Sequence, residues 1–349
     1  MRVFHEKRPA SPWRTATIKY TTTMKKSTTA IVAAIMLLSV TGANLNAAAS
    51  NPNPPSAPAA AAGGDSFTLD GLVYTVVDAA NNLVELSGND GTHPTSVNVI
   101  SPISYGGTDY TVVSIGAGAF RGSDILMTFY ADDNVKSVGE AAFAGCSSMI
   151  SVLFVDVEAI GDSAFYNCGV INELELGTSL KSIGEFAFAS GSTYIAFSIP
   201  ASVESIGKGA FISCGSEEFI VDEANQNYCS VDGVLFTKDK AELVAYPYGK
   251  TQIEYTVPDG VKRIGEYAFS KIDNIYKINL PESLESIGGY AFYGIYSIRR
   301  IDVPAGVTVT IAENNLVTVK GPKGTLEREL PVEMNIKEED GHIVVTRPN

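Results

Sequence analysis

The sequence predicts a strand-rich α/β solenoid in which short coils with short helical turns stack on one another. Three observations predict it: a kernel Ile/Val-Gly-x-x-Ala-Phe occurs seven times, its spacing is nearly fixed, and an alternating apolar pair follows almost every copy. The steps between the kernel phenylalanines are 23, 22, 23, 23, 58 and 23 residues, and a period in the twenties is typical of a solenoid. These phenylalanines are Phe120, Phe143, Phe165, Phe188, Phe211, Phe269 and Phe292.

The alternating pair predicts one strand in each coil. Nine and eleven residues after each kernel phenylalanine the chain is mostly apolar, and period-two alternation indicates a strand with one buried face. A proline follows directly in three coils, where it would end the strand because it has no amide proton to donate. The pairs are Phe129/Ala131, Val152/Phe154, Leu174/Leu176, Phe197/Ile199, Ile278/Leu280 and Ile301/Val303.

Glycine fills its kernel position in all seven copies. Two reasons fit, a backbone with positive φ or a close approach to the neighbouring coil, and a Cβ would obstruct either. The Ala-Phe step that follows is compatible with one short helical turn.

Two further β elements are expected at the start and in the middle of the array. From Asp65 the pattern FTLDGLVYTVV, an Asn81-Asn82 turn and LVELSG predicts a hairpin that caps the first coil. The 58-residue step holds 35 extra residues, and Val234–Phe236 and Leu243–Tyr246 flank a polar turn within them. We therefore expect a hairpin inserted into the solenoid at about residues 222–250.

The strings IGxxAFxxC and IxIPxxVxS resemble the BspA-like class of bacterial leucine-rich repeats. Residues 97–120 are similar to the entry module of such proteins, and the resemblance covers about residues 67–303. It implies a secreted or cell-surface binding module with no catalytic residues. The predicted fold class is thus an α/β leucine-rich repeat solenoid, strand-rich, with short helical turns, a β-hairpin cap, an inserted hairpin and a short β-rich C-terminal segment.

The N-terminal region predicts export. Met24–Ala49 has a positive start at Lys25-Lys26, an apolar run over Ala30–Val40 and small residues at Ala47–Ala49, which is the layout of a secretory signal peptide. Residues 1–23 would be a spurious extension, and residues 50–64 are a Pro/Ala-rich linker. An uncleaved signal anchor is the alternative, although the apolar run is shorter than the ~20 residues that span a bilayer. The mature protein is then secreted or on the bacterial cell surface, without a membrane span.

Charge disfavours nucleic acid as a partner. The chain carries a formal charge of −14, and residues 27–349 alone carry 18 basic and 38 acidic side chains. Such a surface repels phosphate backbones.

No enzymatic, metal or cofactor site is expected. The three histidines, His5, His93 and His342, have no metal spacing, and no nucleophile elbow or phosphate loop occurs. Cys146, Cys168 and Cys214 each lie three residues after a kernel phenylalanine, and Cys229 lies in the insertion. The first two could form a disulfide, or all could be small buried residues; parallel Cβ directions favour the second reading.

The exposed face of the repeat strands is the candidate ligand site. Positions eight and ten after each kernel phenylalanine alternate with the buried pair, so they must point outward, and they vary from coil to coil. An extended protein or glycan ligand suits such a face, and Tyr130 and Leu153 are its large exposed side chains. The alternative is a structural spacer whose strand face only keeps the sheet soluble. The candidate residues are Thr128, Tyr130, Ser151, Leu153, Glu173, Glu175, Ala196, Ser198, Glu254, Thr256, Lys277 and Asn279.

Residues 304–349 depart from the repeat. PAGVTVTI and VTVKGPKG resemble the opening of the bacterial large-subunit ribosomal protein number six, which implies rRNA binding. A degenerate repeat that acts as a cap is the alternative, and residues 302–349 hold eight acids against five bases. We expect strands at 307–311, 316–320 and 342–346 that cover the exposed edge after Ile301–Val303.

Overall fold

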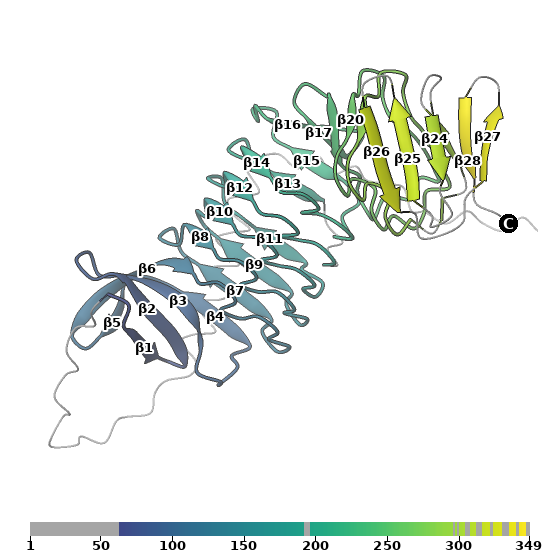
Figure 1. Ribbon diagram of the computed structural model, residues 1–349. Coiled ribbons are helices and arrows are strands. Elements are labelled where there is room, and N and C mark those ends of the chain that lie inside the picture. The colour runs from purple at the N-terminus through teal and green to yellow at the C-terminus, as the bar shows by residue number, and fades with distance from the viewer. Residues whose placement is uncertain are drawn as a thin grey trace, which may run out of the picture. The chain divides into compact units, whose positions relative to one another are not determined.

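The structure is a computed structural model that describes residues 63–191, 196–295, 297–298 and 300–303, and five strands between residues 308 and 346 (Figure 1). The expected extension, signal peptide and most of the linker lie outside the described residues. The described part contains strands and turns.

An N-terminal cap covers the first coil, as expected. β1 (Ser66–Leu69), β2 (Leu72–Asp78) and β3 (Leu83–Asn89) pair in antiparallel order. β3 then pairs in parallel with β6 (Thr108–Ile115), and β5 (Ile103–Tyr105) lies on β6. Leu72, Tyr74 and Val76 alternate toward the core because one face of β2 is buried.

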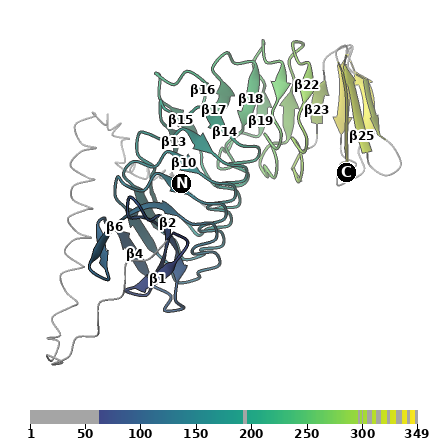
Figure 2. The ribbon, with the colours of Figure 1, turned by 60° about the vertical axis from the view of Figure 1, so that its left-hand side comes forward.

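Most coils contribute a two-residue strand from the kernel and a longer strand about fourteen residues later. The kernel strands β8 (Ser137–Val138), β10 (Ala159–Ile160), β12 (Ser182–Ile183) and β14 (Ser205–Ile206) continue in parallel from β6. The longer strands β4 (Ser96–Val99), β7 (Thr128–Ala131), β9 (Ser151–Phe154) and β11 (Glu173–Glu175) form a second parallel ladder. β13 (Phe197–Ile199) and β15 (Phe219–Val221) pair separately. Figure 2 shows the same succession of coils from another side.

The expected short helical turns are absent from the described residues, where the Ala-Phe step is a pair of tight turns. Positive φ angles flank the step in all seven kernel copies, for example at Ala141 (51°) and Gly145 (78°) around Ala142-Phe143. A helix needs consecutive residues with negative φ, so it cannot propagate there. The backbone instead closes i→i+3 bonds, such as Ala144 N to Ala141 O at 3.1 Å.

The kernel phenylalanines stack, but their column is interrupted. Adjacent ring centroids from Phe120 to Phe211 lie 5.1–6.1 Å apart, and Phe269 and Phe292 lie 5.5 Å apart. The core is correspondingly split into two clusters that meet within the insertion, since Leu235 belongs to the first and Val234 and Phe236 belong to the second.

The kernel glycines are required by close approach and not by positive φ. A Cβ on Gly184 would lie 2.5 Å from the backbone nitrogen of Asp162 in the preceding coil, and one on Gly207 would lie 2.4 Å from that of Glu185. The second of the two expected reasons is therefore the correct one.

The insertion is a hairpin plus an eighth coil that the kernel pattern did not predict. β16 (Tyr228–Val231) and β17 (Val234–Thr237) form the hairpin, and β17 also pairs antiparallel with β18 (Glu242–Ala245). β18 is itself a kernel strand, because Leu243 pairs with Ile264 of β20 (Arg263–Ile264). Tyr246 takes the position of the kernel phenylalanine and stacks on Phe269 at 5.2 Å.

The remaining coils continue to the C-terminal segment. β19 (Glu254–Thr256), β21 (Lys277–Asn279) and β23 (Arg300–Val303) form the long ladder, and β22 (Ser286–Ile287) follows β20. β28 (His342–Thr346) pairs antiparallel with β23, and β27 (Asn335–Glu339) pairs with β28. β24 (Thr308–Ile311), β25 (Leu316–Gly321) and β26 (Gly324–Glu329) form a separate sheet. The segment covers the edge of the last coil, as expected.

Candidate binding face

The outward positions of the long strands form rows across neighbouring coils. Thr128, Ser151 and Glu173 are in register on β7, β9 and β11. Tyr130, Leu153 and Glu175 form the next row on the same strands. After the insertion, Glu254 pairs with Lys277 and Thr256 with Asn279. The two groups belong to different sheets, with Ala196 and Ser198 on a third segment between them.

The predicted exposure is wrong for two of the candidate residues. Ser151 and Leu153 are only 5% and 7% exposed. Both lie on the middle strand of their rows, between the side chains of β7 and β11. Ser151 Oγ also donates a hydrogen bond of 3.0 Å to Glu173 Oε2. Exposed candidates are Glu173, Glu175, Ser198, Glu254 and Thr256; half-buried ones are Thr128, Tyr130, Ala196, Lys277 and Asn279.

The group after the insertion compensates its own charges. Lys277 Nζ lies 2.8 Å from Glu254 Oε1 and 3.6 Å from Asp302 Oδ2. Asn279 Nδ2 donates to Glu254 Oε1 at 3.0 Å and to Thr256 Oγ1 at 2.9 Å. The polar atoms of this part of the face are thus engaged with one another.

The group before the insertion has an uncompensated acidic end. Among the described residues, neither Glu173 nor Glu175 forms an ion pair. Two strands away, on β7, Tyr130 is half-buried, and burial together with Asp132 and Asp133 raises the pKa of its hydroxyl. A cationic side chain that approached this end would meet two carboxylates.

Sequence reasoning missed four exposed apolar residues at the edge of the face. Met127, Ile150, Ile253 and Tyr276 are 42%, 37%, 64% and 48% exposed, and each immediately precedes a long strand. They lie in adjacent pairs, since Ile150 N donates to Met127 O and Tyr276 N to Ile253 O. The signal was available, because each stands seven residues after a kernel aromatic once Tyr246 is counted.

Other candidate chemistry receives no support in the described part of the chain. No group of three or more His, Cys, Asp or Glu side chains is arranged to hold a metal ion there. Cys146 and Cys168 are free, and their Sγ atoms lie 3.1 Å from the carbonyl oxygens of Phe120 and Phe143. Burial raises the pKa of the Cys146 thiol to about 12, so it is a small buried residue rather than a reactive one. No helix in the described residues is long and apolar enough to cross a membrane.

Comparison with known proteins identifies the repeats. The model of the BspA type leucine rich repeat region matches residues 113–231 and 245–316 in six copies, which is more than half of the chain. The chain belongs to the BspA-type leucine-rich repeat family. A leucine-rich repeat protein from Eubacterium ventriosum is 25% identical, with a TM-score of 0.57 over 69% of this chain and 67% of that one. The pneumococcal vaccine antigen PcpA is 24% identical, with a TM-score of 0.50 over 68% of this chain and 70% of that one, and shows the same fold.

The C-terminal segment matches a different family. The ribosomal protein L6 model matches residues 303–349. Large ribosomal subunit protein uL6 from Lachnoclostridium phytofermentans is 71% identical over 45 residues, and that from Clostridioides difficile is 68% identical over 44. The chain spans about a quarter of the length of these curated relatives. The matched residues make up 13% of this chain. No catalytic family is indicated by either match.

Proposed function

We propose that the protein is an exported, non-catalytic interaction module that binds an extended, basic segment of a protein through the long-strand face. The observation that carries this proposal is the pair Glu173 and Glu175, exposed and without an ion pair in the described residues. Family membership supports an interaction role, since stacked repeats create extended binding surfaces.

The geometry favours a ligand that crosses several coils. Paired strands lie about 4.8 Å apart, so Thr128 and Glu173, on either side of the buried Ser151, offer contacts about 10 Å apart on two different coils. The apolar edge at Met127 and Ile150 would contact aliphatic parts of the ligand, while the carboxylates would select its charge. A neutral glycan would offer hydroxyl donors to the two carboxylates but no opposite charge.

We predict that Glu173→Gln combined with Glu175→Gln weakens binding of basic peptides about tenfold, because two ion pairs at the interface are lost. The measurement is surface plasmon resonance against peptides selected with the wild-type chain from an array, at low and high salt. The matched control is Glu204→Gln with Glu217→Gln, which removes the same charge from exposed positions off the strand face. Equal losses from both double variants would show a general charge effect and contradict the site.

We also predict that the protein is exported by means of a cleaved signal peptide. Replacing Lys25 and Lys26 with Glu should abolish secretion, because the positive start of a signal peptide is lost. The measurement is cell fractionation with N-terminal sequencing, which should find a mature end between Ala47 and Ser50. Lys7→Glu with Arg8→Glu should leave secretion intact, since both precede the second start at Met24. Cytosolic protein that retains Met1 or Met24 would refute the prediction.

The similarity of the tail to uL6 favours rRNA binding as a second candidate function. Against it, β28 is occupied in pairing with β23, and the tail is acidic. We therefore expect that filter binding of the full chain to ribosomal RNA shows no tight, salt-sensitive interaction. Deletion of residues 312–349 should lower the melting temperature, because the edge of β23 loses its partner, without changing peptide binding. Tight RNA binding with a steep salt dependence would make the ribosomal function the better one.

A further inference from the structure

Aromatic residues occupy a strained backbone position in three coils. The fourth kernel residue has positive φ in all seven copies of the kernel, and glycine fills it only at Gly118 and Gly209. A bulky side chain in this region costs about 1–3 kcal/mol, so glycine would be the less costly choice. Three copies nevertheless have Phe186 (54°), Tyr267 (60°) and Tyr290 (55°) there. The backbone therefore does not explain these side chains.

The three rings form a continuous series with Tyr293. Phe186 contacts Tyr267 edge-on at 5.2 Å, Tyr267 stacks on Tyr290 at 5.1 Å, and Tyr290 meets Tyr293 at 5.8 Å. We call these four residues the aromatic ladder. At its far end Tyr290 and Tyr293 are 51% and 46% exposed. These two rings stand at 87° to each other, which leaves an angular corner between an aromatic face and an edge.

The ladder is continuous because the eighth coil lacks a turn. Leu243 to Tyr246 spans four residues where the other kernels use six, so nothing projects between Phe186 and Tyr267. The ring of Phe186 lies over Gly209, where a Cβ would come within 2.7 Å of it. Lys208 also reaches across this gap, and its Nζ lies 3.2 Å from Glu266 Oε1.

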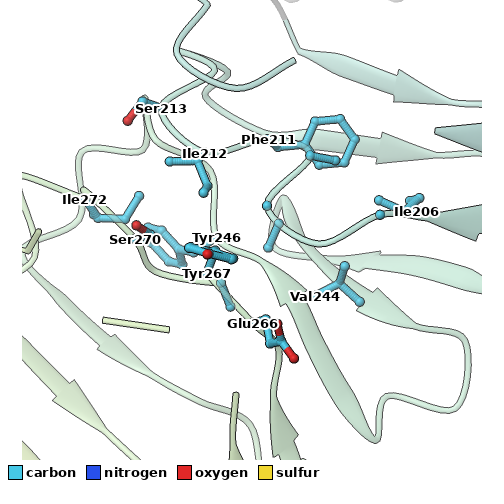
Figure 3. A pocket seen from close by; sticks show the side chains of 15 residues that line it. Ile206, Phe211, Ile212, Ser213, Val244, Tyr246, Glu266, Tyr267, Ser270 and Ile272 are labelled. Carbon is cyan, nitrogen blue, oxygen red and sulfur yellow. The ribbon is translucent and has the colours of Figure 1, made fainter. Parts of the chain in front are cut away.

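A small pocket lies beneath this crossing. Ile206 and Phe211 line it on one side and Ser270 and Ile272 on the other, with Tyr246 between (Figure 3). The hydroxyl of Tyr246 is buried without a hydrogen-bond partner in the described residues. The space suits about one water molecule and not a larger ligand. A larger ligand would therefore bind on the aromatic ladder and not in this pocket.

The ladder suits an uncharged, preformed ligand. Lys208 neutralises Glu266, and the residue before Tyr290 is Gly289, where the two other aromatic kernels have Glu185 and Glu266. Aromatic surfaces of this kind dock polyproline II segments, whose rigid backbone loses little entropy on binding. This chain contains such a segment outside the described residues. Residues 50–64 contain no charged side chain and hold Pro52, Pro54, Pro55 and Pro58, which form two overlapping PxxP patterns.

We propose that the aromatic ladder binds the proline-rich segment of a second copy of this chain. The segment of the same copy is too short to reach Tyr290. From β1 to β22, which precedes Tyr290, there are ten strand or coil steps of ~4.8 Å, about 48 Å. Pro52 lies eleven residues before Gly63, and eleven residues span at most about 40 Å when fully extended. The contact is thus heterologous, and it links successive copies head to tail.

A labelled peptide of residues 50–64 tests the proposal by fluorescence anisotropy. The receptor is the full chain with Pro52, Pro54, Pro55 and Pro58 changed to Ala, so that its own segment does not compete. We expect saturable binding that is unchanged between about 50 and 500 mM salt, because no charge is involved. Tyr290→Gly with Tyr293→Ala should weaken it at least about tenfold. Glycine fits this slot, as at Gly118 and Gly209, so the variant keeps its backbone.

Two controls separate binding from stability and from self-association. Tyr166→Ala removes an exposed tyrosine outside the ladder and should leave peptide affinity unchanged. In sedimentation velocity, the wild-type chain should associate with rising concentration, whereas the proline variant and the ladder variant should both remain monomeric. Absence of saturable binding at about 1 mM peptide would overturn the proposal. A ladder variant with a lower melting temperature but unchanged affinity for the peptide would also overturn it. The rings would then only stabilise the array across the shortened coil.

Discussion

Gly184→Ala should destabilise the protein by about 3 kcal/mol or more, at the upper end of what overpacking costs. The new Cβ would lie 2.5 Å from both Asp162 N and the carbonyl carbon of Gly161. These are backbone atoms of the preceding coil, so they cannot move aside as a side-chain tip would. Because each coil packs only on its neighbours, the two coils must separate or the turn must rebuild. Urea unfolding of the full chain, followed by circular dichroism, measures the loss.

The matched control is Gly191→Ala in the same coil. Among the described residues, a Cβ there would meet only Phe188 O, at an ordinary contact distance of 3.6 Å, and the equivalent position in three other coils is a cysteine. We expect a change within about 0.5 kcal/mol. If both substitutions cost the same, the close approach of successive kernels would not be the reason for the kernel glycine.

The sequence predicted the repeat and the strands because both depend on local pattern. The kernel defines the register, so the buried positions of β7, β9, β13 and β21 followed directly from counting. The hairpin cap followed from alternation in the same way. The prediction of a helical turn was wrong because residues such as Ala141 and Ser163 have a positive φ that their residue types do not indicate. Only Gly118 and Gly209 hinted at it.

The eighth coil was not predicted, because it packs like a kernel but lacks the kernel sequence. Leu243 and Tyr246 occupy the Ile and Phe positions, but Val244 follows Leu243 where the kernel has glycine, and the turn is two residues shorter. Tyr246 still fills the aromatic column, which shows that the column tolerates another ring of similar size.

For the candidate binding face, the direction in which the side chains point was predictable, but their exposure was not. Alternation put Leu153 outward, yet its exposure depends on the sizes of its neighbours on two other coils, which no single-strand pattern contains. The ion pairs of Lys277 are similar, because they join residues 23 and 25 positions apart in sequence. The aromatic ladder depends on the shortened coil, so it could not be expected before that coil was known.

Phe143→Ala should produce the other large loss, about 3–5 kcal/mol, because it leaves a cavity inside the aromatic column. Phe143 is fully buried, and its ring lies 5.6, 4.7 and 5.1 Å from those of Phe120, Phe129 and Phe165. Each aromatic pair contributes about 0.5–1.5 kcal/mol beyond the area it buries. Urea unfolding of the full chain again provides the measurement.

The loss of stability on removing a ring should depend on where its coil lies in the array. Phe292→Ala should cost less than Phe143→Ala, since Phe292 is only half-buried and stacks on one kernel phenylalanine, Phe269. Tyr166→Ala, next to the column but 44% exposed, should cost less than about 0.5 kcal/mol. The order Phe143, Phe292, Tyr166 follows from nearest-neighbour stacking, in which an interior ring loses partners on both sides and a terminal ring on one. Equal losses at Phe143 and Phe292 would mean that the rings do not stabilise the array through their neighbours.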